Sequence, residues 1–403
     1  MTETAHNLDQ HMSDLRQILA QGKKRIGILL GAGTAGSINI SKDKSKYEPL
    51  IPAIAGLTKI VTDSLSADEG KQLATITKSL SPSPNIEEIL SKIRALSSAL
   101  KGVDTKLGDY KQENYDNLAA SICKKISDVV KCKLPSNETP YNRLAGWVGG
   151  TDRNKAVEIF TSNYDLLMEE ALEAAKIPFF CGFSGSCEPF FDAASISNND
   201  DLPSRWARLW KLHGSLGWGL NEKEELVAGK SRDTAGLIYP DHLKYDHIQK
   251  LPYTALFDRL RKFLTTPDTL LLSCGFSYAD AHISAVINEA LSANPASSVF
   301  AFLYQEIDKE LAAKKLAMQR PNFSAYACDR AVINCTDGKW ELGKNDDNKD
   351  WHHIRKSFWA TRDSGRDHMF TLGDFAAFAE FFALSKSDLS YSTVTPPPRV
   401  SVL

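Results

Sequence analysis

Three short apolar runs, each ended abruptly by a polar segment, constrain the fold of this chain most. The runs and their tails are Ile26–Leu30 before Gly31–Gly36, Val157–Phe160 before Thr161–Asp165, and Leu270–Leu272 before Ser273–Ser277. A short apolar run bounded by turn residues is typical of a strand buried on both faces of a parallel sheet. Ligands of open α/β sheets bind at the carboxyl ends of such strands. We therefore expect these tails to meet in one crevice, together with Lys211–Ser215.

Strand and helix patterns alternate from residue 155 onward, which predicts an α/β fold with a Rossmann-like, doubly wound parallel sheet. Between residues 49 and 150 strand patterns fade, and Asn85 with Glu88 forms a capping box at the start of a clear helix. We interpret this stretch as an inserted helical module. The expected organisation is an N-terminal helix and first strand (1–48), the helical insertion (49–150), the remainder of the sheet domain (151–340), and a C-terminal loop, helix and tail (341–403).

Further elements follow from local patterns. Strands are expected at 25–30, 157–160, 178–181, 269–272, 298–304 and 331–334, helices at 166–175, 254–264 and 280–293, and loops at 184–204 and 345–350. Residues 7–21 show one apolar helical face, for which packing on the sheet is favoured over docking on a neighbouring subunit. Three tryptophans lie near residue 213 in the sequence: Trp206, Trp210 and Trp218. We expect two of these three side chains to be buried in the core.

Composition narrows the class of protein. The chain has 403 residues, 24% of them charged, as expected of a globular protein. Its net charge of −2 does not predict a nucleic-acid surface, although a net sum does not reveal local basic patches. It has no run of 18 apolar residues and no apolar core of a signal peptide near its first residue, so we expect a cytoplasmic protein. Its seven cysteines are scattered and include no Cys-x-x-Cys pair, so neither a disulfide framework nor a metal site is expected.

The glycine-rich segment Gly31-Ala32-Gly33-Thr34-Ala35-Gly36 fits the G-x-G-x-x-G pattern after a strand. Such a turn lets the backbone approach a pyrophosphate closely. A dehydrogenase would also need an acidic residue about 20 positions further on, at the end of a second strand. Asp43, Glu48 and Asp63 do not follow a convincing strand, which weakens that interpretation. The alternative is that the glycines serve only a tight joint between strand and helix.

Two side chains are the best candidates for chemistry. Asn163 follows the second strand, and its amide can both donate and accept hydrogen bonds, whereas Ser162 and Asp165 also fit a helix cap. His213 precedes Gly214, and imidazole can act as a general base at neutral pH. A solitary histidine is more often structural, and Asp280 at the start of a helix is by default a cap.

The four segments together resemble the motifs of the sirtuin superfamily, in the same order. Gly31-Ala32-Gly33, Thr161–Asp165, His213-Gly214 and Gly275-Phe276-Ser277 match its Gly-Ala-Gly turn, Asn-containing box, His-Gly pair and Gly-Thr-Ser turn. The resemblance covers about residues 22–37 and 155–340 and is closest to bacterial sirtuin-like proteins of anti-phage defence that consume NAD⁺. It implies catalytic roles for Asn163 and His213. The implied NAD contacts are Gly31, Ala32, Gly33, Thr34, Asn163, Asp165, Gly275, Ser277 and Asn334.

The chain also departs from the sirtuin pattern. Phe276 replaces the central threonine, and Ser37–Lys42 lacks the Pro-x-Phe-Arg part of the loop that clamps NAD. The paired Cys-x-x-Cys ligands of the sirtuin zinc module are absent from the sequence. These departures favour hydrolysis of NAD⁺ over deacetylation of a peptide.

The resemblance therefore implies an NAD⁺ hydrolase that releases nicotinamide and ADP-ribose and is restrained until triggered. It also implies a HerA-type ATPase partner. We further expect a homo-oligomer, whereas the sequence indicates neither a membrane partner nor direct nucleic-acid binding. Two alternatives stay open: an NAD- or ADP-ribose-binding scaffold subunit of a DNA-acting ATPase complex, and a protein deacylase. The first would be favoured if Asn163 and His213 pointed apart, and the second would need a peptide groove beside them.

Overall fold

A ten-stranded sheet organises the computed structural model, which describes residues 4–43, 45–80, 83–150, 154–198, 201–223, 225–229, 252–343, 349–360 and 368–385. The strands in spatial order are β1 (Ala5–Asn7), β14 (Thr336–Glu341), β13 (Arg330–Ile333), β12 (Phe323–Tyr326), β11 (Ser298–Phe302), β10 (Thr269–Cys274), β2 (Arg25–Leu30), β3 (Glu158–Thr161), β7 (Ala207–Lys211) and β4 (Phe179–Phe180). Neighbours from β12 to β4 are parallel, and β13 is antiparallel to both of its neighbours.

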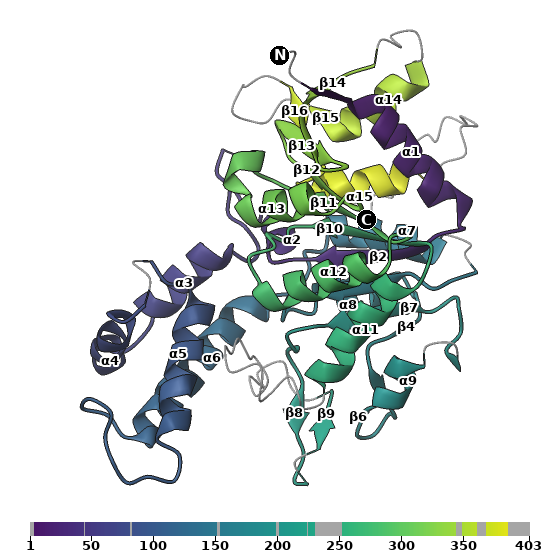
Figure 1. The fold of residues 1–403 in the computed structure, drawn as a ribbon. Helices are drawn as coiled ribbons and strands as arrows, with labels where there is room; N and C mark the ends of the chain where they lie inside the picture. The colour runs from purple at the N-terminus through teal and green to yellow at the C-terminus, as the bar shows by residue number, and fades with distance from the viewer. Residues whose placement is uncertain are drawn as a thin grey trace, which may run out of the picture.

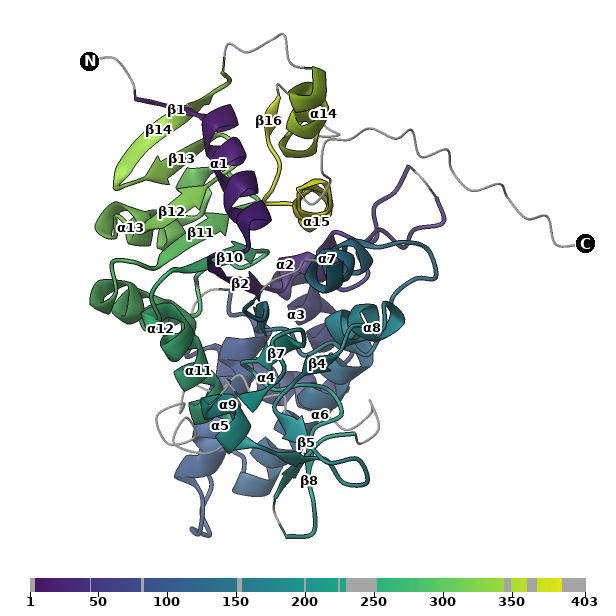
Figure 2. The same ribbon diagram turned by 90° about the vertical axis from the view of Figure 1, so that its right-hand side faces the viewer.

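Helices cover both faces of the sheet, which confirms the predicted doubly wound α/β class (Figure 2). Alternate strand residues point to opposite faces, so Ile28 and Leu30 join one buried cluster while Leu29 joins the other. The first cluster includes buried residues of α1 (Leu8–Gln21), α7 (Pro140–Gly150), α8 (Leu167–Ala174) and α15 (Phe375–Leu384), among other helices. The second includes buried residues of α11 (Tyr253–Thr265), α12 (Ala281–Ala293) and α13 (Leu311–Gln319).

The strand order reverses direction at β2. From β2 the chain adds β3, β4 and β7 on one side of it, and then β10, β11 and β12 on the other. The loops that leave neighbouring strands at such a reversal diverge to opposite faces, which opens a crevice at the carboxyl ends of the strands. The connections after β2, β3 and β10 therefore border the position where a ligand of this fold binds.

Four helices form a module that projects away from the sheet (Figure 1). They are α3 (Ile54–Asp63), α4 (Ala67–Thr77), α5 (Ile86–Ala99) and α6 (Gln112–Val130). The next helix, α7, packs instead on α8 and α15 and belongs to the layer over the sheet. The helices that stand off the sheet therefore end well before residue 150, the predicted end of the insertion.

The N-terminus of α5 carries the predicted capping box. Asn85 Oδ1 accepts hydrogen bonds from Glu87 N at 2.9 Å and Glu88 N at 3.0 Å, and Glu88 Oε2 accepts one from Asn85 N. We expect Asn85→Ala to lower the free energy of unfolding by about 1 kcal/mol, because two backbone donors lose their partner. Urea unfolding followed by circular dichroism measures this, with Asn85→Ser as the control that keeps a capping oxygen. Equal stability of the two variants would contradict the prediction.

Several expectations about local elements hold. The apolar face of α1 (Leu8, Met12, Leu15 and Leu19) is buried within the chain's own core. Trp210 and Trp218 are buried and Trp206 is half-buried, as predicted. No helix among the described residues is both long and apolar enough to cross a membrane.

Other elements differ from the expectation. The predicted loop 184–204 contains parts of a small four-stranded sheet and a helix: β5 (Phe183–Ser184), β6 (Phe190–Phe191) and α9 (Ala193–Ser197), with β8 (Gly219–Leu220) and β9 (Leu226–Val227) completing that sheet. Residues 349–350 of the predicted loop 345–350 belong to α14 (Lys349–Phe358), which is followed by the β15 (Trp359–Ala360) and β16 (Met369–Phe370) pair. The rest of that loop and the Pro396–Pro398 tail lie outside the described residues.

Candidate active site

Strand register brings the four polar segments to one edge of the sheet. The strands β10, β2, β3 and β7 are parallel neighbours, and Leu30 is paired with Cys274 on one side and Thr161 on the other. Thr161 is in turn paired with Lys211. The glycine turn, the Asn163 segment, the His213 segment and the Gly275 turn therefore leave the sheet at the same level.

The turns after β2 and β10 touch through their backbones. Gly31 N donates to Cys274 O at 3.1 Å, and Gly33 N donates to Gly275 O at 3.0 Å. A Cβ on Gly31 would collide with the carbonyl of Gly275, and Gly275 itself has φ +68°. Both positions need glycine, one for the close approach and the other also for its left-handed backbone.

This contact corrects part of the predicted pyrophosphate cradle. Thr34 N donates to Gly31 O at 3.1 Å, so the N–H groups of Gly31, Gly33 and Thr34 are all bound within the protein. Thr34 is fully buried, whereas Ala32 and Gly33 are exposed, and α2 (Gly33–Gly36) is only four residues long. For these three N–H groups the alternative of a tight structural joint is the better description, because Cys274 O, Gly275 O and Gly31 O already accept from them.

The Asn163 side chain is anchored to the glycine turn. Its Nδ2 donates to Gly31 O and to Thr34 Oγ1, each at 3.1 Å. A carbonyl oxygen can only accept, so the nitrogen of the amide must face Gly31. With both amide hydrogens bound, Oδ1 is the part of Asn163 that can meet a ligand, as an acceptor.

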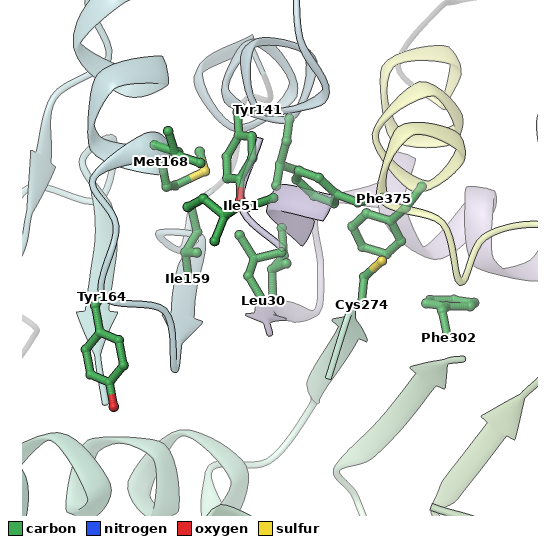
Figure 3. Packing of buried hydrophobic residues seen from close by; sticks show 14 of the residues in the cluster. Leu30, Ile51, Tyr141, Ile159, Tyr164, Met168, Cys274, Phe302 and Phe375 are labelled. Atoms are coloured by element: carbon green, nitrogen blue, oxygen red, sulfur yellow. The ribbon is translucent and has the colours of Figure 1, made fainter. Parts of the chain in front are cut away.

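Tyr141 holds the other side of this anchor. Its hydroxyl lies 2.9 Å from Thr34 Oγ1, which itself donates to Gly31 O at 2.8 Å. Burial raises the pKa of Tyr141 well above its ordinary value, so the hydroxyl stays protonated and donates to Thr34. Figure 3 shows Tyr141 reaching from α7 toward the end of β2, beside Ile51 and Leu30. The orientation of Asn163 is therefore set from the sheet-covering layer.

Asp165 is a structural residue, and its expected contact with NAD is not supported. The side chain is buried, and its Oδ1 accepts from Leu167 N at 3.0 Å at the start of α8. The buried Lys211 ammonium binds the Asp165 backbone carbonyl and lies 3.3 Å from Glu169 Oε1. Burial raises the pKa of the Asp165 and Glu169 carboxyls, and Lys211 opposes this rise. Sequence patterns did not single out Lys211, which ties the Asn163 segment to the strand before His213.

His213 is buried beside the Asn163 segment. Its ring centroid lies 6.4 Å from that of Tyr164. Its Nε2 lies 3.0 Å from Asp280 Oδ2, which is within ion-pair distance, but the ring N–H is not directed at the carboxylate and makes no hydrogen bond to it. Leu216 N donates to Tyr164 O at 3.0 Å, which holds the two segments together. The expected pair of Asn163 and His213 thus lies on neighbouring strand ends.

The last two predicted NAD contacts, Ser277 and Asn334, lie in different parts of the sheet. Ser277 is exposed just after Gly275, at the expected edge of the sheet. Asn334 instead forms, with Cys335, the tight turn between β13 and β14, where both residues have positive φ. Because β13 runs antiparallel to β12, this turn lies at the opposite edge of the sheet from Asn163. The structure therefore does not bring Asn334 together with the other predicted NAD contacts.

Among the described residues, no group of three or more His, Cys, Asp or Glu side chains is placed to hold a metal ion. The seven cysteines are free thiols. Burial raises the pKa of the Cys181 thiol to about 11, which keeps it protonated and unreactive.

Comparison with known proteins adds a family match. Residues 157–322 match the model of the SIR2-like domain. Among solved structures, one entitled "Structural Basis for the Mechanism and Regulation of Sir2 Enzymes" is 13% identical, with 74% of this chain and 86% of that chain covered and a TM-score of 0.31. Cytosolic 5'-nucleotidase IIIB bound to cytidine is 12% identical, with 76% and 83% covered and a TM-score of 0.29. No curated protein matches the chain.

These findings differ in what they support. The two structures have TM-scores too low to bear on the fold or function of this chain. The family match begins at Val157, so it excludes the glycine turn and the helical module but spans β3, β7 and β10 with the turns that follow them. Asn163, His213 and Gly275 therefore all lie within the part of the chain that matches the SIR2-like domain model.

Proposed function

We propose that this protein hydrolyses NAD⁺ at the bond between nicotinamide and ribose, releasing nicotinamide and ADP-ribose. The observation that carries the proposal is the arrangement of Asn163, whose amide donors are bound to Gly31 O and Thr34 Oγ1. Its free acceptor, Oδ1, suits a water molecule or a ribose hydroxyl. The neighbouring strand end supplies His213 as a base.

Unpaired buried polar atoms support a ligand at this place. Tyr164 OH and Ser215 Oγ are buried and have no hydrogen-bond partner among the described residues. They flank Asn163 and His213 in the sequence, on the two segments joined by the Leu216–Tyr164 hydrogen bond. A buried polar group without a partner costs free energy, so such groups mark a site that a polar ligand completes. The fit is better for the nicotinamide–ribose end than for the pyrophosphate, since three turn N–H groups are already bound.

The chemistry of the substrate then assigns roles to these residues. Water adds to the anomeric carbon, the carbon–nitrogen bond breaks with its electron pair passing to nicotinamide, and the water proton leaves. Asn163 Oδ1 orients the water or a ribose hydroxyl by accepting a hydrogen bond. His213 takes the proton, and the carboxylate of Asp280 lies 3.0 Å from its Nε2. Ala32 and Gly33, which are exposed on the turn, are the predicted residues open to the rest of the dinucleotide.

The testing experiment follows nicotinamide and ADP-ribose by chromatography after NAD⁺ is mixed with the purified full-length protein. We expect the two products in equal amounts without an acyl-lysine substrate. Asn163→Asp should lower turnover about tenfold to a hundredfold, since an oxygen then faces Gly31 O and the side chain turns away, at a cost of about 1–3 kcal/mol. Turnover that requires an acyl-lysine peptide would instead make the protein a deacylase. NAD⁺ binding without turnover in any condition would favour the scaffold function.

The resemblance to defence proteins extends the proposal to regulation. Uncontrolled NAD⁺ hydrolysis is toxic, so we propose an effector of anti-phage defence that is restrained until triggered, works as a homo-oligomer and pairs with a HerA-type ATPase. The same assay with and without that ATPase measures whether the partner changes turnover, and sedimentation of the two proteins measures whether they associate.

A further inference from the structure

The carboxylate of Asp280 makes two different contacts. Oδ1 accepts from His282 N at 2.8 Å and Ile283 N at 3.0 Å, which caps the N-terminus of α12. Oδ2 lies 3.0 Å from Nε2 of His213, on the segment after β7. The cap was expected from the sequence, but the contact with His213 was not. One side chain therefore connects α12 to the proposed base.

We propose that Asp280 is a positioning residue that sets the tautomer of His213. A carboxylate can only accept, so the ring nitrogen that faces it carries the proton. With Nε2 protonated toward Asp280, Nδ1 is the nitrogen with a lone pair and faces the substrate as the base. The role of Nδ1 rests on the proposed hydrolase function, whereas the tautomer does not.

The surroundings of the pair favour this role. The His213 side chain is 7% exposed and the Asp280 side chain 14%, so water screens their interaction only weakly. The two hydrogen bonds to Oδ1 fix the carboxylate with its Oδ2 3.0 Å from Nε2 of His213. Contacts of this kind are often poorly aligned before substrate binds. Tyr164 beside the ring adds no charge, because burial raises the pKa of its hydroxyl well above the ordinary value.

The two roles of Asp280 can be separated by one substitution. Asp280→Asn keeps an oxygen for the cap, and asparagine caps helices as well as aspartate does. It removes the charge and offers His213 an amide, which can donate as readily as accept. Asp192→Asn is the control for the same change at another helix cap: Asp192 Oδ1 accepts from Ser195 N at the start of α9, and its Oδ2 accepts from the Ser184 and Ser195 hydroxyls. We expect both variants to fold with unchanged melting temperature.

Kinetics test the positioning role. We expect Asp280→Asn to lower kcat for NAD⁺ about a hundredfold with little change in KM, since the wrong tautomer impairs the chemical step alone. In a His213→Ala background the same substitution should cause no further loss, because Asp280 acts through His213. An equal, additive loss in both backgrounds, or a loss confined to KM, would overturn the inference.

Nitrogen NMR of the histidine rings tests the tautomer without any activity. The His213 signals are identified by their loss in His213→Ala. Wild-type protein should show the Nε2-protonated tautomer, and Asp280→Asn should shift it toward a mixture. Protonation at Nδ1 in the wild type, or identical signals in the two proteins, would overturn the inference. If the tautomer depends on Asp280 but NAD⁺ is not hydrolysed, the proposed function fails and the positioning role stands.

Discussion

Replacing His213 with alanine is expected to lower the turnover of NAD⁺ about 10²–10⁴-fold, the usual contribution of a general base. The ring is buried next to Tyr164 and Asp280, and the neighbouring strand end holds Asn163. Without the imidazole, bulk water must take the proton. The binding of NAD⁺ should change little, since the loss falls on the chemical step.

The measurement is initial-rate kinetics, with NAD⁺ affinity determined separately by calorimetry. His353→Ala is a suitable control, because His353 is exposed on α14, far along the chain from the site. A melting curve must show that His213→Ala is folded, since a buried ring is removed. Retention of wild-type turnover in a folded His213→Ala protein would exclude His213 as the base.

Replacing Gly275 with alanine is expected to lower the free energy of unfolding by about 2–5 kcal/mol. Gly275 has φ +68°, a conformation that costs an L-residue about 1–2 kcal/mol. The added Cβ would also lie 2.7 Å from Thr34 N and 3.0 Å from Gly33 C. Those neighbours are backbone atoms, so the two turns must move apart, at a typical overpacking cost of about 1–3 kcal/mol.

The same substitution should also impair the site. Moving the turns apart weakens the Gly33–Gly275 hydrogen bond and shifts Gly31 and Thr34, to which the Asn163 amide is bound. Chemical denaturation and NAD⁺ turnover measure the two effects. Gly70→Ala is the control: it lies in α4 with open space around the added Cβ, and should stabilise the protein by about 0.5–1 kcal/mol. Wild-type stability of Gly275→Ala would show that the turns are not held as tightly as described.

The central part of the fold could be predicted because its strands are buried on both faces. The predicted strand 25–30 has the bounds of β2, and the one at 269–272 is extended only by Ser273 and Cys274. Where a strand is covered by helices on both sides, nearly every residue must be apolar, and the run is visible in the sequence. The capped helices α5 and α12 were visible for a similarly local reason, the acceptor at their first residue.

The edge of the sheet was much harder to predict. β14, with the sequence Thr-Asp-Gly-Lys-Trp-Glu, lies near an edge and exposes alternate residues, so it has no apolar run. β12 was also missed, since its four residues include a serine and are too short to show a period. Without these strands, the sequence could not show that β13 runs antiparallel to β12. It therefore could not show that Asn334 lies at the amino ends of the parallel strands, and not at their carboxyl ends with Asn163.

The sequence by itself determined where the central strands end and which polar residues follow each of them along the chain, because both depend on short stretches of sequence. This was enough to single out Asn163, His213 and Gly275. Only the tertiary structure decided how those residues are used. It commits the Asn163 donors to Gly31 and Thr34, buries Lys211 against Asp165, and brings Asp280 to His213. Contacts between residues far apart in the sequence depend on sheet register and on which groups burial leaves unpaired, and no local pattern records either.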